Sequence, residues 1–180
     1  MRIIAGQWRG RPLDAPAGTA TRPTSDRARE GLFSMLTSRL GSFEDLQVAD
    51  LFAGTGALGL EALSRGAAHC TFVEKERTAL DTLKRNVARL GAVEKADIRA
   101  QAVEHAPPPP RPFDLIMMDP PYGVGLAQPA LDRAAEWLAP GGWLSLELHG
   151  ETPTLPPGVE LDTERRFGKA TLILIRRPTA

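Results

Sequence analysis

From residue 47 onward, short apolar segments alternate with amphipathic ones in a regular rhythm, and this rhythm limits the folds open to the chain. Short apolar strands separated by amphipathic helices are typical of a doubly wound, mostly parallel sheet. We therefore predict an α/β, Rossmann-like fold. Its strands are expected at 47–52, 70–74, 97–101, 113–119 and 142–148, and its helices near 57–65, 77–90 and 126–138.

The C-terminal part of the chain breaks this rhythm. Segments 159–167 and 170–176 both have strand patterns, and only Gly168-Lys169 separates them. Two strands joined by so tight a turn must pair antiparallel. We therefore predict a seven-stranded, mostly parallel sheet with an antiparallel C-terminal edge hairpin. The proline run at 107–110 predicts a stiff surface spacer ahead of the 113–119 strand.

The N-terminal part differs in composition from this core. Residues 2–13 have the pattern of a short β-rich arm, the segment up to residue 24 is rich in Pro, Gly and Thr, and a helix is expected from about Asp26 to Leu40. At 180 residues the chain fits a single domain. We expect residues 1–24 to form arm and loop, and residues 25–180 to form the helix and the core.

Charge is unevenly distributed, although the whole chain has a net charge of zero. Residues 1–40 contain seven Arg and three acidic residues, a local charge of +4 that suits phosphate contacts. No apolar run reaches the ~18–20 residues that span a bilayer, and the start lacks a signal-peptide pattern. With Cys70 as the single cysteine, no intramolecular disulfide can form. We expect a cytoplasmic, monomeric protein that does not contact membranes.

A glycine-rich loop directly follows the first strand of the core. The segment from Asp50 contains Gly54, Gly56 and Gly59 in G-x-G-x-x-G spacing at a strand-to-helix junction. Glycine lets the backbone turn sharply and come close to a ligand. Glu74 ends the second strand, 20 residues after Gly54, where a carboxylate can accept hydrogen bonds from both ribose hydroxyls of an adenosine. The pattern predicts an adenosine-containing cofactor.

Asp50 helps to decide which cofactor this is. An acid at the head of the glycine loop would repel a pyrophosphate, but it suits the ammonium and sulfonium of S-adenosylmethionine. The same carboxylate could instead cap backbone N–H groups of the loop, and both roles can coexist. We predict S-adenosylmethionine at this site. The binding residues are expected to be Asp50, Phe52, Gly54, Thr55, Gly56, Glu74, Lys75, Gln101, Ala102 and Asp119.

The fourth strand runs into Asp119-Pro120-Pro121-Tyr122, the most specific motif in the chain. An exocyclic amine of a nucleobase is a poor nucleophile, because its lone pair is delocalised into the ring. The Asp119 carboxylate and the Pro120 carbonyl can each accept one of its N–H groups and so free the lone pair. Tyr122 offers a flat face for base stacking. We predict that Asp119, Pro120 and Tyr122 catalyse direct methyl transfer to such an amine.

Other functions fit less of the pattern. An NAD-dependent oxidoreductase would leave the D-P-P-Y motif unexplained, and a catalytically silent RNA-binding module would have no use for Glu74 and Asp119 together. Cys70 is expected to be a small buried hydrophobe rather than a nucleophile. We expect the three histidines at the surface: His69, His105 and His149. None of them has a metal-ligand partner at helix or strand spacing, so no metal site is predicted.

The chain resembles the RsmD family, which methylates the exocyclic N2 of one guanine in bacterial 16S ribosomal RNA. The resemblance covers nearly the full length. Its family-discriminating part is RPTSDRARE over 22–30, because the glycine loop and D-P-P-Y also occur in many other amino-methyltransferases. The matching segments are MRIIAGQWRGRPL at the start, RPTSDRARE, DLFAGTGALGLEALSRGA from Asp50, FVEKE from Phe72, DPPY from Asp119 and RFGKATLILI from Arg166.

This resemblance implies a class I methyltransferase fold and a substrate of 16S ribosomal RNA, within the small ribosomal subunit or an assembly intermediate. Where the family has an Asp after the third strand, this chain has Gln101. A DNA adenine-N6 or cytosine-N4 methyltransferase remains the alternative, although such enzymes usually carry a sizeable target-recognition domain. The resemblance places substrate contacts at Arg22, Thr24, Asp26, Arg27, Arg29, Pro121 and Tyr122.

Overall fold

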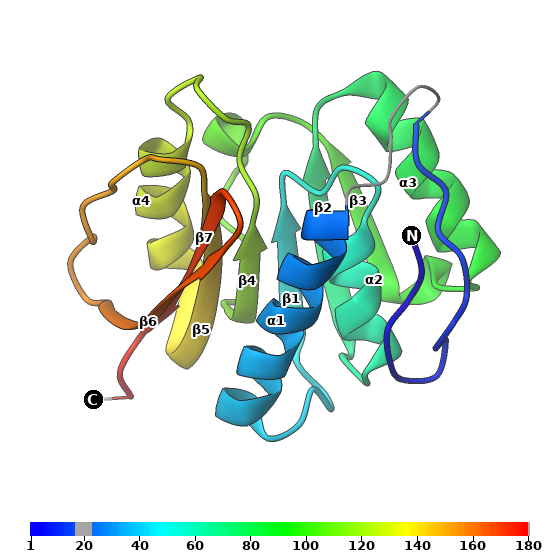
Figure 1. Cartoon of the computed structure of the whole chain (residues 1–180), viewed down its shortest axis with the longest axis horizontal. Helices are drawn as coiled ribbons and strands as arrows, with labels where there is room; N and C mark the ends of the chain where they lie inside the picture. Colours follow the sequence, from blue (N-terminus) through cyan, green and yellow to red (C-terminus); the bar gives the residue numbers. More distant parts are fainter. Residues whose placement is uncertain (17–22, 180) are drawn as a thin grey trace.

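The computed structural model describes residues 1–16 and 23–179. Within them, a seven-stranded sheet has the order β3-β2-β1-β4-β5-β7-β6 (Figure 1). Its parallel part and its antiparallel edge are those expected from the alternating pattern and the C-terminal hairpin. The strands are β1 (Gln47–Leu51), β2 (His69–Glu74), β3 (Ala96–Ala100), β4 (Phe113–Met118), β5 (Leu138–Leu148), β6 (Glu160–Phe167) and β7 (Ala170–Arg176).

The order of the strands reverses beside β1. This strand pairs in parallel with β2 on one side and with β4 on the other. The connections leaving the carboxyl ends of β1 and β4 therefore run in opposite directions and leave a crevice between them, the usual ligand position in a doubly wound sheet. Beyond β4, β5 is still parallel, whereas β7 inserts antiparallel between β5 and the edge strand β6.

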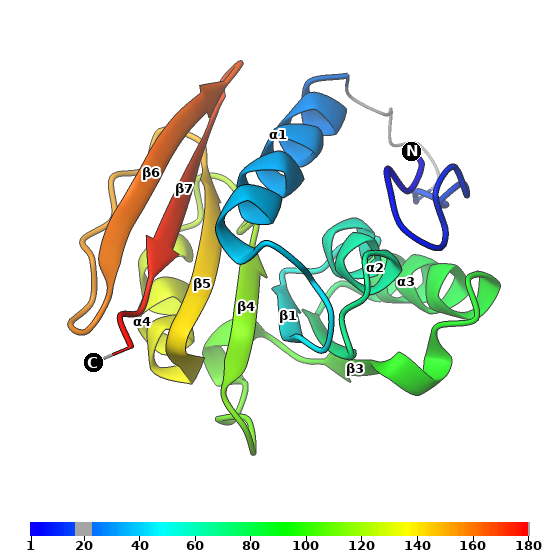
Figure 2. The ribbon, with the colours of Figure 1, turned by 90° about the horizontal axis from the view of Figure 1, so that it is seen from below.

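Helices cover both faces of the sheet (Figure 2). One apolar core lies beneath α1 (Pro23–Leu40), α2 (Ala57–Ser64) and α3 (Arg77–Arg89), and a second lies beneath α4 (Ala127–Trp137). Along β1, successive residues enter opposite cores, since Val48 belongs to the first and Ala49 to the second. Two short 3-10 helices, η1 (Val93–Lys95) and η2 (Val103–His105), flank β3. Cys70 is fully buried in the first core, as predicted.

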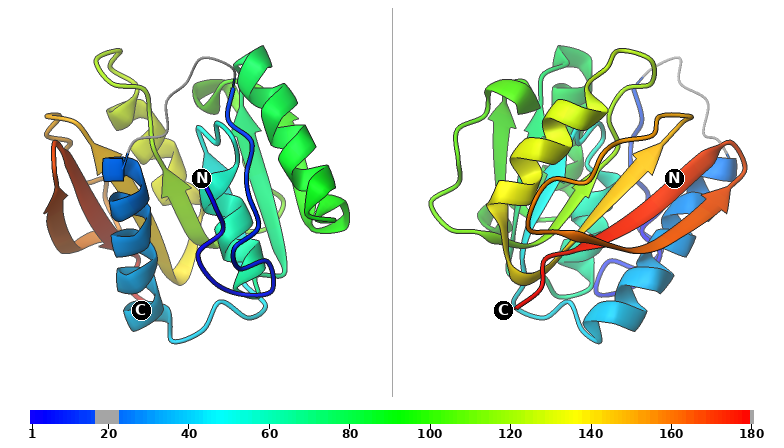
Figure 3. Two further views of the ribbon diagram at one scale, coloured as in Figure 1. Left: turned by 45° about the vertical axis from the view of Figure 1, so that its right-hand side comes forward. Right: turned by 90° about the vertical axis from the view of Figure 1, so that its left-hand side faces the viewer.

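The N-terminal arm is more irregular than predicted. Instead of a β-rich segment, the described part contains one isolated antiparallel bridge between Arg2 and Pro12. Its backbone groups bind helix side chains instead: Ile4 and Ala5 donate to the buried Glu61, at 2.8 and 3.0 Å. The arm lies along α2 and α3 (Figure 3, left). Some of its backbone groups bond to side chains of these helices, and others bond within the arm, as the Ile3 N–H does to the Arg11 carbonyl at 3.0 Å.

Two further predictions concern the start of β5 and the proline run before β4. Strand β5 begins at Leu138, earlier than expected, because α4 leads straight into it and the pairing with β4 shifts register between Phe113 and Leu115. The proline run 107–110 lies largely at the surface, as a spacer should. Among the described helices, none is both long and apolar enough to cross a membrane.

Candidate active site

The glycine loop leaves β1 with a strained backbone. Phe52 has a positive φ of 62°, which is uncommon for a residue other than glycine, and Gly54 and Gly56 have φ values of 57° and 86°. A Cβ at Gly54 would meet open space, whereas one at Gly56 would lie 2.3 Å from the Leu83 side chain. The two glycines therefore have different roles. Gly54 allows the backbone to turn on the open side of the loop, and Gly56 allows the loop to pack against α3.

Asp50 supports this loop from inside the sheet. Its side chain is 1% exposed, and Oδ2 accepts a hydrogen bond from the backbone N–H of Gly59 in the first turn of α2, at 2.9 Å. The pKa of Asp50 is raised to about 8: burial is the main cause, the Gly59 hydrogen bond opposes it, and repulsion from Glu74 adds to it. Asp50 also lines a hollow of about 220 Å³ together with Gly54 and Thr55. The structure thus shows the capping role and leaves the carboxylate beside a ligand-sized space.

Glu74 lies across the loop from Asp50 and lines a second hollow, of about 590 Å³. Its two oxygens accept hydrogen bonds from the backbone N–H groups of Gly54 and Glu76, both at 2.8 Å. Because each carboxylate oxygen has two acceptor positions, both can also accept a ligand hydroxyl. The same hollow is lined by other residues predicted to hold the cofactor: Phe52, Lys75, Gln101, Ala102 and Asp119.

The D-P-P-Y motif follows the last residue of β4. Pro120 is buried, while the Tyr122 ring is 71% exposed and faces the solvent side of the loop. Within the described part of the chain, no backbone N–H donates to the Pro120 carbonyl. That this carbonyl accepts a hydrogen bond from the substrate stays a prediction.

Asp119 lies where three hollows in the described surface meet. It lines the one beside Asp50, the one beside Glu74, and a third of about 770 Å³ that also contains Pro120, Pro121 and Tyr122. Burial raises the pKa of Asp119 well above its usual value, and Glu147 raises it further through repulsion and a shared hydrogen bond. A strongly perturbed carboxyl group at the junction of several cavities is typical of a reaction centre.

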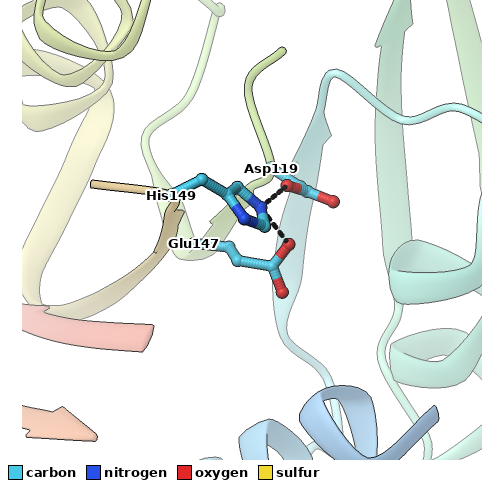
Figure 4. A group of neighbouring side chains, drawn as sticks. All are labelled: Asp119, Glu147 and His149. Atoms are coloured by element: carbon cyan, nitrogen blue, oxygen red, sulfur yellow. Dashed lines mark hydrogen bonds and ion pairs between the residues drawn. The ribbon is translucent and has the colours of Figure 1, made fainter. Parts of the chain in front are cut away.

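Two residues at the carboxyl end of β5 complete this centre: Glu147 within the strand and His149 directly after it (Figure 4). The Nε2 atom of His149 lies 3.2 Å from Oε2 of Glu147 and 4.0 Å from Oδ1 of Asp119. The expectation that His149 has no partner at strand spacing was wrong, because the Glu147 side chain, two residues earlier, contacts it. The pattern Glu-x-His was visible in the sequence, but only the pairing of β5 with β4 brings it to Asp119.

These surfaces fit an adenosine-bearing cofactor with a cationic tail. Glu74 lies in the hollow large enough for a nucleoside, and the buried Asp50 carboxylate lies in the adjoining one. A buried carboxyl group with its pKa raised to about 8 is costly to ionise, and a cationic ligand would offset that cost.

Comparison with known proteins agrees with this geometry. A family model described as Conserved hypothetical protein 95 matches residues 1–176. Ribosomal RNA small subunit methyltransferase D of Escherichia coli (strain K12) is 37% identical over 181 residues, which cover 98% of this chain and 90% of that protein. The chain belongs to the RsmD family.

Solved structures related to this chain have the same architecture. The Escherichia coli protein yhhF superposes with a TM-score of 0.86 at 34% identity, covering 100% of this chain and 99% of that one. The Haemophilus influenzae protein HI0767 superposes with a TM-score of 0.81 at 33% identity, covering 98% of both chains. The predicted class I methyltransferase fold is confirmed.

The terminal RFGKA segment, one of the resemblances to the RsmD family, forms the turn between β6 and β7. Phe167 packs so tightly on α1 that a Cβ at Gly31 would lie 2.2 Å from its ring. This packing holds the turn against α1, and Gly168 and Lys169 line the third hollow together with Ala28 of α1. Sequence analysis did not assign Lys169 to the site, although its place in a matching terminal segment was a signal.

The residues at the start of α1, which are characteristic of the RsmD family, have different environments. Arg22 lies outside the described residues, as does the side chain of Thr24. Arg27 is exposed, whereas Arg29 is only 8% exposed and donates to the Arg2 carbonyl at 2.8 Å. Asp26 lies 3.7 Å from Arg29 and lines the hollow beside Asp50.

The burial of Arg29 changes its expected role. Burial lowers the pKa of Arg29, and the carboxylate of Glu61, 3.8 Å away, opposes that shift. A guanidinium enclosed in this way ties the N-terminal arm to α1. We therefore do not propose Arg29 as a phosphate contact, and Arg27 is the better placed of the two.

Proposed function

We propose that this chain transfers a methyl group from S-adenosylmethionine to the exocyclic N2 amine of a guanine in 16S ribosomal RNA, within the small subunit or an assembly intermediate. The observation that carries the proposal is the position of Asp119, next to the Pro120 carbonyl and at the junction of the hollows. The name of the Escherichia coli relative supports ribosomal RNA as the substrate class. The choice of guanine N2 rests on the resemblance to the RsmD family.

The two hollows beside the glycine loop would hold the cofactor. Glu74 would accept hydrogen bonds from the ribose hydroxyls, and Asp50 would lie beside the cationic amino-acid tail. Lys75, Gln101 and Ala102 line the far part of the nucleoside hollow. When bound, S-adenosylmethionine supplies an electrophilic methyl group on a sulfonium, and the reaction depends mainly on how well the nucleophile is positioned.

The third hollow would hold the base. Asp119 and the Pro120 carbonyl would each accept one N–H of the target amine, which returns its lone pair to the nitrogen. Asp119 also stabilises the positive charge that develops there. Tyr122 has the exposed ring face that stacking requires, worth ~1–3 kcal/mol. The residues at the rim of this hollow thus perform orientation and charge stabilisation.

Cationic side chains near this hollow suit an RNA backbone. Lys169 lines it from the β6–β7 turn, and Arg27 is exposed on α1 next to Ala28, which also lines it. Extruding a stacked base costs a few kcal/mol, and a loop nucleotide costs less. The arm and α1 would therefore supply specificity together with the shape of the ribosomal particle.

The direct test uses the purified protein with radiolabelled S-adenosylmethionine and 30S particles that lack their native methylation. Naked 16S RNA and duplex DNA serve as parallel substrates, and Asp119→Ala serves as the inactive control. Digestion to nucleosides then identifies the product. We expect N2-methylguanosine in RNA from the particles and none with the variant.

Two results would contradict the proposal in different ways. Label found only in DNA would identify a base-modifying DNA enzyme. Cofactor binding without label in any substrate would overturn the substrate assignment and leave the fold and the cofactor site standing.

A further inference from the structure

Glu147 and His149 have no place in the hydrogen bonds that orient the amine, yet they lie beside Asp119. Both line the third hollow together with it (Figure 4). The His149 side chain is 34% exposed, and Glu147 is 20% exposed. An imidazole that contacts two carboxylates and also reaches solvent is well placed to move a proton.

The proposed reaction produces one proton in each turnover. A neutral amine that gains a methyl cation becomes positively charged and must lose a proton to give the product. Asp119 is the nearest acceptor, and its raised pKa makes it a stronger base than an ordinary carboxylate. The same property makes it retain the proton, so Asp119 needs a second group to return it to the ionised form.

We propose that His149, oriented by Glu147, takes the proton from Asp119 and releases it to solvent. The inference rests on the proposed function. The N–H bond of the methylated amine breaks, its electron pair stays on nitrogen, and the proton joins an oxygen of Asp119. From there it passes to Nε2 of neutral His149, over the 4.0 Å gap that one water or a small rotation closes. Glu147, at 3.2 Å, stabilises the resulting imidazolium.

Asp119 is surrounded by several charged groups, and each affects when it ionises. Glu147 contributes most after burial, followed by Asp50 from β1 and Glu151, which lies just after β5. Tyr122 packs edge-on against the His149 ring with centroids 6.1 Å apart. Three cationic side chains also line hollows that Asp119 lines: Arg29 from α1, Lys75 after β2 and Lys169 from the β6–β7 turn.

The test is a pH profile of the single-turnover methyl-transfer rate and of the steady-state rate for the wild type, His149→Gln and Glu147→Gln. Since Asp119 must be ionised, the wild-type rate should fall as pH drops below the raised pKa of Asp119. Glu147→Gln removes the repelling carboxylate, so this fall should shift to lower pH. His149→Gln should leave the single-turnover rate close to that of the wild type, because Asp119 begins that turnover ionised, and should lower the steady-state rate by about 100-fold where the wild type is fastest, the scale of general-base catalysis.

Chemical rescue distinguishes a proton acceptor from a structural residue. With His149→Ala, added imidazole should restore the steady-state rate in proportion to the concentration of neutral imidazole. His105→Gln, an exposed histidine outside these hollows, is the matched control and should behave as wild type. Calorimetry should show that each variant still binds S-adenosylmethionine, which separates loss of proton transfer from loss of the cofactor site.

The outcomes are distinguishable. A wild-type steady-state rate in His149→Gln, or an unmoved pH profile in Glu147→Gln, would overturn the proton pathway while N2-methylguanosine formation by the wild type upholds the function. Activity that EDTA abolishes and a divalent metal restores would also overturn it, because the three side chains would then hold a cation. A wild type that binds cofactor but methylates no RNA would overturn both proposals.

Discussion

The carboxyl ends of β1 and β4 each present an aspartate to the same crevice, but in opposite settings. Asp50 belongs to β1, is 1% exposed and is held by Gly59, nine residues further along the chain. Asp119 follows β4, has a side chain that is 48% exposed, and has Glu147 of β5 and the following His149 as neighbours. Both aspartates have raised pKa values.

The difference shows how similar acids acquire different tasks. Asp50 is enclosed by its own loop, so it can respond to a ligand in the hollow beside it. Asp119 opens onto three hollows and contacts a half-exposed histidine, so it can meet a substrate and pass a proton on. We therefore assign cofactor binding to the β1 end and the reaction to the β4 end.

The largest expected effect separates these two tasks. Asp119→Ala should lower the methyl-transfer rate by about 10³-fold, because both a hydrogen-bond acceptor and a charge at the reacting nitrogen are lost. Cofactor affinity should change little. Single-turnover rates and calorimetry measure the two quantities. If the variant instead lost cofactor binding and kept its rate at saturation, the assignment of the two ends would be reversed.

Glycine substitutions in the segments that follow β1 and β4 should differ in how far they lower the free energy of unfolding. Gly59→Ala would place a Cβ 2.4 Å from the Phe72 ring and 2.6 Å from the Cys70 sulfur, and should lower the free energy of unfolding by about 2 kcal/mol. Gly123→Ala, after D-P-P-Y, meets nothing within 4 Å but has a φ of 77°, so it should cost no more than about 1 kcal/mol.

Urea denaturation of both variants measures this difference. Equal losses would show that the loop after β4 is packed as firmly as the loop after β1.

Asp50→Asn should weaken cofactor binding about tenfold near pH 7, while the rate at saturation stays close to that of the wild type. In the free protein, the pKa of Asp50 is raised to about 8, so its carboxyl group is mostly protonated at pH 7. A cationic ligand favours the ionised form. Binding should therefore release about one proton, and affinity should rise as pH increases from about 6 to 7.5.

Calorimetry in two buffers of different ionisation enthalpy measures this proton release. The asparagine retains an oxygen that can accept the Gly59 N–H, so the loop should stay folded. Proton release that persists in the variant would rule out Asp50 as its source.

The smallest expected effect concerns RNA. Lys169→Ala should weaken RNA binding about fivefold and reduce the slope of log K against log salt by about one, because one phosphate contact is lost. Lys75→Ala removes an equal charge from the cofactor side of the crevice and serves as the control. Filter binding over a range of salt concentrations measures both. Equal slopes for the two variants would place the RNA elsewhere.

Much of the fold could be predicted, because it depends on patterns among residues that are close together in the sequence. Alternating strands and helices, the glycine loop and the tight turn at Gly168 are all local in sequence, and the structure places strands and helices within a few residues of the predicted ranges. The N-terminal arm could not be predicted in the same way. Part of its backbone bonds to the side chains of Glu61 and Ser64, more than 50 residues away, and no local pattern signals such partners.

By itself, the sequence determined the class of fold and placed the acids of β1, β2 and β4 at one edge of the sheet. The reason is that parallel strands bring their carboxyl ends to one edge whatever the details of packing. Only the tertiary structure decided what surrounds those acids. Pairing of β5 with β4 brings His149 to Asp119, and the packing of α1 buries Arg29 beneath the arm. The physical reason is that burial and charge depend on neighbours distant in the chain, which a local pattern does not encode.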